Sequence, residues 1–378
     1  MVAGRVALLY SQRDGYLNNL YPAQAPDGLA GGSPGSGAGA DMGDDDTLAL
    51  RGTLDFRLNE DLLFRVSANY ARSKLATGPY QSKSTIGVVD ANGELINVID
   101  TPAGETRLTI QGDGDAGADA IDGDQFLPGA GIGLGARLAP GGDFFGYIDP
   151  DGEGLDTSGD FAFEDNGEVE TFGLNARFEW DLSAQTTLTS ISDFKDYSKS
   201  LFIDVDSAPM NQLANYAGVD ATSFTQELRL GGSTEHMRWV AGLYYLNIDN
   251  QSDNGLKAPV NSIVGTFATP VDIGTVSELE TNSYSLFGQL EYDLTPRLTG
   301  IVGLRGIREE KEFQTLIGVF LSEGNFGFNR GQLLNSPFGE GSPFRYSDEV
   351  SKNLWAAKLQ LDYRASDDLL YGDRKSVV

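Results

Sequence analysis

The chain has 378 residues, a formal net charge of −28 at pH 7 and no cysteine. Without cysteine, disulfide frameworks and thiol nucleophiles are excluded, and the single histidine, His236, rules out a zinc site of the usual ligand type. The negative charge repels phosphate backbones, so nucleic acid is not an expected partner. No apolar run approaches the roughly 18 residues that a spanning helix needs, which excludes a helical membrane protein.

From the N-terminus onward, alternation of apolar and polar residues predicts amphipathic strands. Val6 to Tyr10 are predicted to form the first strand, although its two faces differ little in polarity. A loop rich in Gly, Pro and Asp follows over about residues 18–46. The clearest pair comprises Leu48–Leu58 and Phe64–Tyr70, which a tight turn joins. Each strand of this pair has one apolar face and one face that carries polar or charged side chains.

A second long loop is predicted over residues 77–168, with a small hairpin at Ile86–Val98 that turns at Asn92-Gly93. Asp113 to Asp124 place carboxylates at intervals that suit a calcium loop. However, Ala118 stands where such a loop needs glycine, and the last ligand is not glutamate. A solvated acidic loop is therefore the favoured interpretation.

The alternation then resumes in strands near Phe172–Leu182, Phe224–Leu246, Tyr284–Leu304 and Trp355–Tyr363, whereas the facing of Thr187–Tyr197 is not assigned by its pattern. Loops are predicted at about residues 198–221, 250–280 and 314–348. Short and long connections alternate, which is typical of transmembrane barrels with short periplasmic turns and long extracellular loops. The predicted short turns are Asn59–Asp61, Ser183–Gln185, Gly231–Glu235, Thr295–Arg297 and Ala365–Asp368.

Aromatic residues recur on the apolar face near the short turns, as in the runs before Leu58, Leu182 and Leu294. Amphipathic rings at one height are what a membrane interface selects. We therefore expect a group of interface aromatics comprising Phe56, Trp180, Trp239, Tyr292 and Tyr363. The alternative interpretation is a soluble β-sandwich with these rings at the ends of its core.

The expected fold is all-β: a transmembrane antiparallel β-barrel, incomplete, with about 10 to 11 strands of a larger barrel. No catalytic, cofactor or metal site is predicted, because no carboxylate pair stands out in a defined pocket, and the chain is not expected to be an enzyme. His236 is interpreted as a surface residue in a turn. The polar face also carries six cations: Arg51, Arg57, Arg177, Arg229, Arg305 and Lys358. These side chains could line a path for an anionic ligand. We favour the alternative, in which they pair with carboxylates of the barrel or with a plug.

Phe224–Leu246, with its Gln-Glu-Leu-Arg-Leu strand and Trp-Val-Ala-Gly-Leu-Tyr-Tyr return, resembles the barrel of TonB-dependent outer-membrane receptors. Thr281–Phe313, with Ser-Tyr-x-x-Phe-Gly-Gln, Tyr-Asp-Leu-Thr and Gly-Leu-Arg, is similar to the same family. The resemblance implies the outer membrane of a Gram-negative bacterium, contact with its lipid, and TonB-energised uptake of a small ligand, chiefly a ferric-siderophore-type complex. The ligand-binding residues are not identified by it. The alternatives are a passive porin-like channel and a soluble acidic β-sandwich binding protein.

The sequence departs from the receptor family in containing no plug, TonB box or closing strand with an aromatic end. We expect residues 1–372 to be part of a barrel domain that contacts the TonB complex only through a plug outside this sequence. Residues 373–378, DRKSVV, match what one frame of a common sequencing adapter encodes, and we expect them to be a non-native tail.

Overall fold

The computed structural model describes residues 1–21, 39–76, 85–89, 92, 95–100, 107–111, 120–122, 151, 154–157, 159, 167–205, 214–258, 271–321, 333–334, 343–366 and 369–377. All its regular elements are strands. In that part of the chain, no helix has the length and apolar character needed to cross a membrane.

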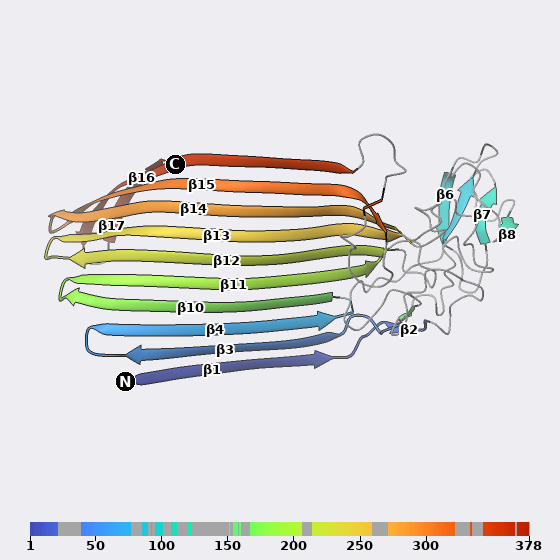
Figure 1. The fold of residues 1–378 in the computed structure, drawn as a ribbon, viewed down its shortest axis with the longest axis horizontal. Coiled ribbons are helices and arrows are strands. Elements are labelled where there is room, and N and C mark those ends of the chain that lie inside the picture. Colours follow the sequence, from blue (N-terminus) through green and yellow to red (C-terminus); the bar gives the residue numbers. More distant parts are fainter. Residues whose placement is uncertain are drawn as a thin grey trace.

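Eleven strands form one antiparallel sheet whose order follows the chain, β1-β3-β4-β10-β11-β12-β13-β14-β15-β16-β17 (Figure 1). Successive strands are therefore hairpin neighbours, the simplest connection for an antiparallel sheet. The strands are β1 Val2–Arg13, β3 Asp45–Arg57, β4 Leu62–Leu75, β10 Gly167–Ser183, β11 Thr186–Asp204, β12 Ala214–Ser233, β13 Met237–Ala258, β14 Val271–Thr295, β15 Leu298–Leu321, β16 Phe344–Ser366 and β17 Leu369–Val377.

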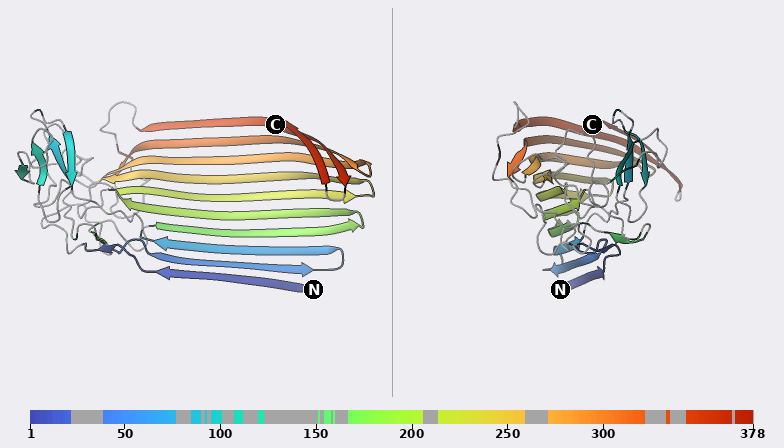
Figure 2. Two further views of the ribbon diagram at one scale, coloured as in Figure 1. Left: turned by 180° about the vertical axis from the view of Figure 1, so that it is seen from behind. Right: turned by 90° about the vertical axis from the view of Figure 1, so that its right-hand side faces the viewer.

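The sheet is twisted and curved when viewed end-on, with β1 and β17 at its two edges (Figure 2). A β-sandwich needs two sheets packed face to face. Because the long strands belong to a single sheet, the β-sandwich alternative is wrong, and the prediction of an unclosed barrel with about eleven strands is confirmed.

Short strands lie beyond the long-loop end of this sheet (Figure 1). β5 (Thr85–Val89) and β6 (Leu95–Asp100) pair antiparallel, which confirms the predicted hairpin. The sequence did not reveal the rest of that four-stranded sheet, β7 (Arg107–Gln111) and β8 (Ala120–Asp122), nor the parallel pair of β2 (Asn18–Asn19) and β9 (Asp156–Thr157).

The short turns lie where the alternation predicts them, at residues 58–61, 184–185, 234–236 and 296–297. One boundary differs, because β12 continues through Gly231 and Gly232 to Ser233 before the chain turns. The fifth short connection, residues 367–368, lies outside the described residues.

Three predicted loops are much shorter than expected, because the strands on either side continue into them. β11 runs to Asp204, β13 runs to Ala258, and β14 begins at Val271 and has 25 residues. In these extensions polar side chains occupy both faces, so the alternation that marks a strand in the sequence is lost. Backbone pairing needs no such alternation, and the hairpins therefore continue past the apolar segment.

Burial in the large sheet is concentrated at the long-loop end. Small clusters form there, including Val271 with Val319 and Phe202 with Ala214. Lys257 and Asp272 make a buried ion pair across β13 and β14, with Nζ 2.7 Å from Oδ2. The middle of the sheet carries its large apolar side chains on the surface instead.

Candidate membrane-facing and lumenal surfaces

Directly paired residues on neighbouring strands share a face, so the register divides the sheet into two surfaces. We call the apolar face the surface that holds Leu54, Trp180, Leu286 and the residues in register with them. On it Leu286, Leu304 and Leu359 are 63%, 63% and 60% exposed. An apolar surface that runs over so many strands is far larger than a soluble monomer exposes, and it indicates contact with lipid or protein.

The register also assigns the strand whose facing the sequence left open. Leu188 pairs with Trp180 and Phe194 with Leu174, which places both on the apolar face. Ser190 and Ser192 lie between them on the same face and bond to Gln226 of β12. These polar residues interrupt the apolar face, which is why the alternation could not be recognised in the sequence. Their hydrogen-bonding groups satisfy one another.

All five predicted interface aromatics lie on the apolar face near the short turns. Trp180, Tyr292 and Tyr363 are 45–47% exposed, and Phe56 pairs with Phe64, their ring centroids 6.1 Å apart. Trp239 covers Gly232, where an added Cβ would come within 2.7 Å of the indole nitrogen. A side chain at that position would therefore force the Trp239 ring to shift.

A second aromatic row, which the sequence analysis missed, crosses the apolar face nearer the long loops. Three of its pairs are in ring contact: Phe172 with Phe194 at 6.5 Å, Phe224 with Tyr245 at 6.3 Å, and Tyr245 with Tyr284 at 5.0 Å. The row comprises Tyr10, Tyr70, Phe172, Phe194, Phe224, Tyr245, Tyr284 and Trp355.

The two aromatic rows are eight residues apart along β10, β14 and β16, as in Phe172 and Trp180. At about 3.3 Å per residue this is about 26 Å along the strand, or about 20 Å of height at the roughly 40° tilt of barrel strands, which falls within the roughly 25 Å apolar band of transmembrane barrels. A search for aromatics an even number of residues before the predicted ones would have found Phe172, Tyr284 and Trp355 of this row.

The opposite surface, which we call the polar face, carries ion pairs. Arg65 of β4 binds Asp55 of β3 through Nε to Oδ1 at 2.6 Å and Nη2 to Oδ2 at 2.7 Å. Arg229 lies 2.8 Å from Glu227, and Arg177 also binds the carboxylate two residues further along its strand, Glu179. The favoured interpretation, that inward cations pair with carboxylates, is thus confirmed for Arg177 and Arg229.

The other predicted cations share the polar face. Arg305 donates a 3.0 Å hydrogen bond to the Ser285 hydroxyl and lies over the Tyr244 ring, 5.8 Å from its centroid. Arg51, Arg57 and Lys358 are in register with Asn69, Leu63 and Gly303 respectively.

His236 is exposed in a short turn, as predicted, and lines a pocket of about 610 Å³. Arg238 in the same pocket binds Glu291 and Asp293, each at 3.1 Å. Within the described ranges, no cluster of three His, Cys, Asp or Glu side chains suits a metal ion. The acidic run Asp113–Asp124 lies outside these ranges apart from residues 120–122.

Residues 109–372 match the TonB-dependent receptor-like β-barrel family. The fold is similar to the ferric yersiniabactin uptake receptor FyuA from Yersinia pestis, at 14% identity and TM-score 0.55, covering 99% of this chain and 41% of that one. It is also similar to the open form of the ferric-catecholate import receptor Fiu from E. coli K12, at 11% identity and TM-score 0.50, covering 99% of this chain and 50% of that one.

The chain thus spans half or less of the length of those receptors. No curated protein sequence matches it. Its single antiparallel sheet, its apolar face and the family match over most of its length lead to one conclusion. The chain belongs to the TonB-dependent receptor-like β-barrel family, a family of the Gram-negative outer membrane.

Proposed function

We propose that the chain forms part of the wall of an outer-membrane receptor that takes up a scarce ligand with energy supplied through TonB. Family membership supports receptor function. The observation that carries the proposal is one antiparallel sheet with a lipid-compatible face and an ion-bearing face opposite. A barrel wall needs this division, because one side meets hydrocarbon and the other meets water or a plug.

The proposed orientation places the short turns in the periplasm and the long loops outside the cell. Phe56, Trp180, Trp239, Tyr292 and Tyr363 then lie at the periplasmic interface, and the second aromatic row lies at the outer one. The asymmetry of connection lengths supports this orientation, since transmembrane barrels have short periplasmic turns and longer extracellular loops.

The proposed ligand is a ferric-siderophore-type complex. Support comes from the similar structures, of which one is a ferric yersiniabactin uptake receptor and the other a ferric-catecholate import receptor. On the polar face, Arg177 and Arg229 are neutralised by adjacent carboxylates. The contacts of Arg305 with Ser285 and Tyr244 are with neutral groups, which favours Arg305 as a lumenal cation for an anionic complex.

The test is to recover the complete reading frame and express it in an outer-membrane strain that lacks its own ferric receptors. Under iron limitation, we expect at least one ferric complex to restore growth in cells with TonB and not in cells without it. Equal uptake in both strains would contradict the receptor proposal and favour a passive porin-like channel. TonB-dependent uptake of cobalamin or a saccharide, with no ferric complex active, would overturn the ligand class alone.

We also propose that residues 1–372 are the native barrel segment and residues 373–378 a foreign tail. The backbone of Asp373–Val377, in β17, pairs with Leu361–Ala357 of β16. Backbone hydrogen bonds form with little regard to side chain, so this pairing is compatible with either origin. Resequencing the genomic locus tests the proposal, which fails if DRKSVV is encoded there.

A further inference from the structure

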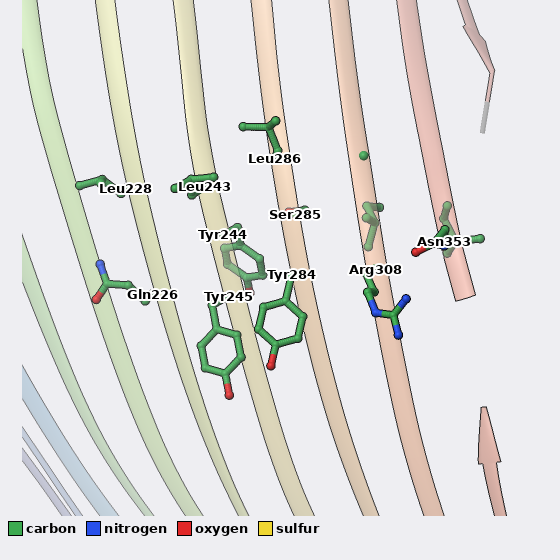
Figure 3. Close-up of a pocket in the computed structure, with 13 residues that line it drawn as sticks. Gln226, Leu228, Leu243, Tyr244, Tyr245, Tyr284, Ser285, Leu286, Arg308 and Asn353 are labelled. Carbon is green, nitrogen blue, oxygen red and sulfur yellow. The ribbon is translucent and has the colours of Figure 1, made fainter. Parts of the chain in front are cut away.

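A groove of about 760 Å³ crosses the apolar face over β12 to β16, beside the second aromatic row (Figure 3). Its floor is Gly306, which the register places directly between Leu286 of β14 and Trp355 of β16. An added Cβ at Gly306 would meet no atom within 4 Å. Because strands are about 4.8 Å apart, the backbones of β14 and β16 are about 10 Å apart, and the absent side chain at Gly306 leaves part of that width open.

The groove changes in polarity along its length. Leu228, Leu243 and Leu286 line the end nearer the middle of the apolar band. At the other end, Figure 3 shows the hydroxyls of Tyr245 and Tyr284 pointing away from these leucines, toward the long-loop side. The groove is therefore apolar at one end and polar at the other, as an amphiphile is.

Arg308 supplies a cation at the polar end. It is in register with Tyr284 on one side and Asn353 on the other, so it belongs to the apolar face. Its guanidinium binds Glu310 through Nε at 2.8 Å and Nη2 at 2.6 Å, and its side chain remains 53% exposed. Glu310 neutralises this cation much as adjacent carboxylates neutralise Arg177 and Arg229. A guanidinium has five N–H donors, however, so the pair fixes its position and leaves further donors for another acceptor.

We propose that this groove binds a phosphorylated acyl lipid from the leaflet on the long-loop side. One acyl chain lies over Gly306 beside Leu286, and the phosphate accepts hydrogen bonds from Arg308 and the Asn353 amide. Arginine suits this role because its planar donors match phosphate oxygens. The inference rests on the proposed orientation in the membrane but not on the identity of the transported ligand.

The headgroup, rather than the chain, must supply most of the selectivity. Lipid tails are as apolar as leucine, so moving a chain from the bilayer into the groove gains packing contacts but little hydrophobic free energy. A charge-assisted hydrogen bond at the edge of the hydrocarbon is stronger than the same bond in water.

The test measures lipid retention by the full-length protein in dodecyl maltoside, titrated with phosphatidylglycerol or phosphatidylcholine and read by native mass spectrometry. The variants are Gly306→Leu, which fills the groove, and Arg308→Gln. The matched controls are Gly52→Leu, whose added Cβ also meets nothing within 4 Å, and Arg177→Gln, on the opposite face, whose guanidinium likewise binds the carboxylate two residues further along its strand. Inorganic phosphate alone distinguishes a lipid site from a free anion site.

We expect saturable binding of phosphatidylglycerol by the native protein and by both controls. Gly306→Leu should abolish it, and Arg308→Gln should weaken it about tenfold or more, the factor that corresponds to one charge-assisted hydrogen bond. Undiminished retention in Gly306→Leu would overturn the groove as the site. Equal binding of phosphatidylcholine in native protein and Arg308→Gln would overturn the assigned headgroup contact. Displacement of the lipid by inorganic phosphate would overturn the lipid as the ligand and show a free anion site instead.

Discussion

Arg65 and Asp55 face each other across β4 and β3 and form two parallel hydrogen bonds of 2.6 and 2.7 Å. Arg65 is also in direct register with Arg177 of β10, so two like charges lie opposite each other on the polar face. Like charges in directly opposed positions destabilise a sheet unless carboxylates offset them. Asp55 and Glu179 lie beside the two arginines and offset the repulsion between them.

We predict that Asp55→Asn lowers the thermal unfolding midpoint of the protein in detergent at low ionic strength. The loss should be small, because the pair is partly exposed, and most of it should disappear in high salt as screening weakens the repulsion between Arg65 and Arg177. The double variant Asp55→Asn, Arg65→Gln is the control and should recover stability at low salt. A salt-independent loss in the single variant would contradict the electrostatic explanation.

The three tryptophans of the chain, Trp180, Trp239 and Trp355, all lie on the apolar face. In bilayers that contain brominated lipids, we predict that each one is quenched in a variant that retains it alone. Quenching should be stronger with bromine near the head group than near the chain end, because the rings belong to the aromatic rows at the edges of the band. If a tryptophan were quenched by aqueous iodide and not by bromolipid, its side chain would face the polar side of the sheet, and the assignment of faces for its strand would be wrong.

Leu359 and Gln360 are adjacent on β16 and face opposite sides. Leu359 lies midway between the two aromatic rows and is 60% exposed. We predict that Leu359→Arg destabilises the folded protein in bilayers by about 2–4 kcal/mol, the cost of arginine near the bilayer midplane.

Gln360→Arg is the matched control for that substitution. The new guanidinium would face the polar side, where Gln360 now donates to Asp362 at 2.9 Å, and the carboxylate would keep a partner. Urea titration of both variants in lipid vesicles measures the difference. Equal costs at the two positions would rule out the assignment of the faces.

Tyr346 lies in the part of β16 beyond the apolar band and donates a 3.0 Å hydrogen bond to Asp348. This bond, with the negative charge of Asp348, raises the pKa of the Tyr346 phenol above its usual range, because both favour the protonated form. We predict that Asp348→Asn lowers the pKa of Tyr346, so that phenolate absorbance rises at lower pH. Glu349→Gln removes a neighbouring charge but leaves the acceptor, and it should change the titration less.

The alternation of apolar and polar residues was enough to predict several features, because it is local. Leu54 and Phe56 share a face from their spacing alone, and the short turns follow from where the pattern stops and restarts. The aromatics before those turns, such as Trp180 and Tyr292, were predicted for the same reason. The resemblance to a receptor barrel likewise rests on short runs of residues.

Other features depend on which residues are paired across strands, and a single strand does not contain that information. The second aromatic row exists only because Phe172, Phe194 and Phe224 are brought to one height by the register. The groove exists because Gly306 lies between Leu286 and Trp355, residues from three different strands. The sequence by itself therefore determined the two faces of most strands, though not of Thr187–Tyr197, and the hairpin order, through side-chain period and turn chemistry. Only the tertiary structure decided the neighbours on each face, since register and strand length come from backbone pairing between segments far apart in the chain.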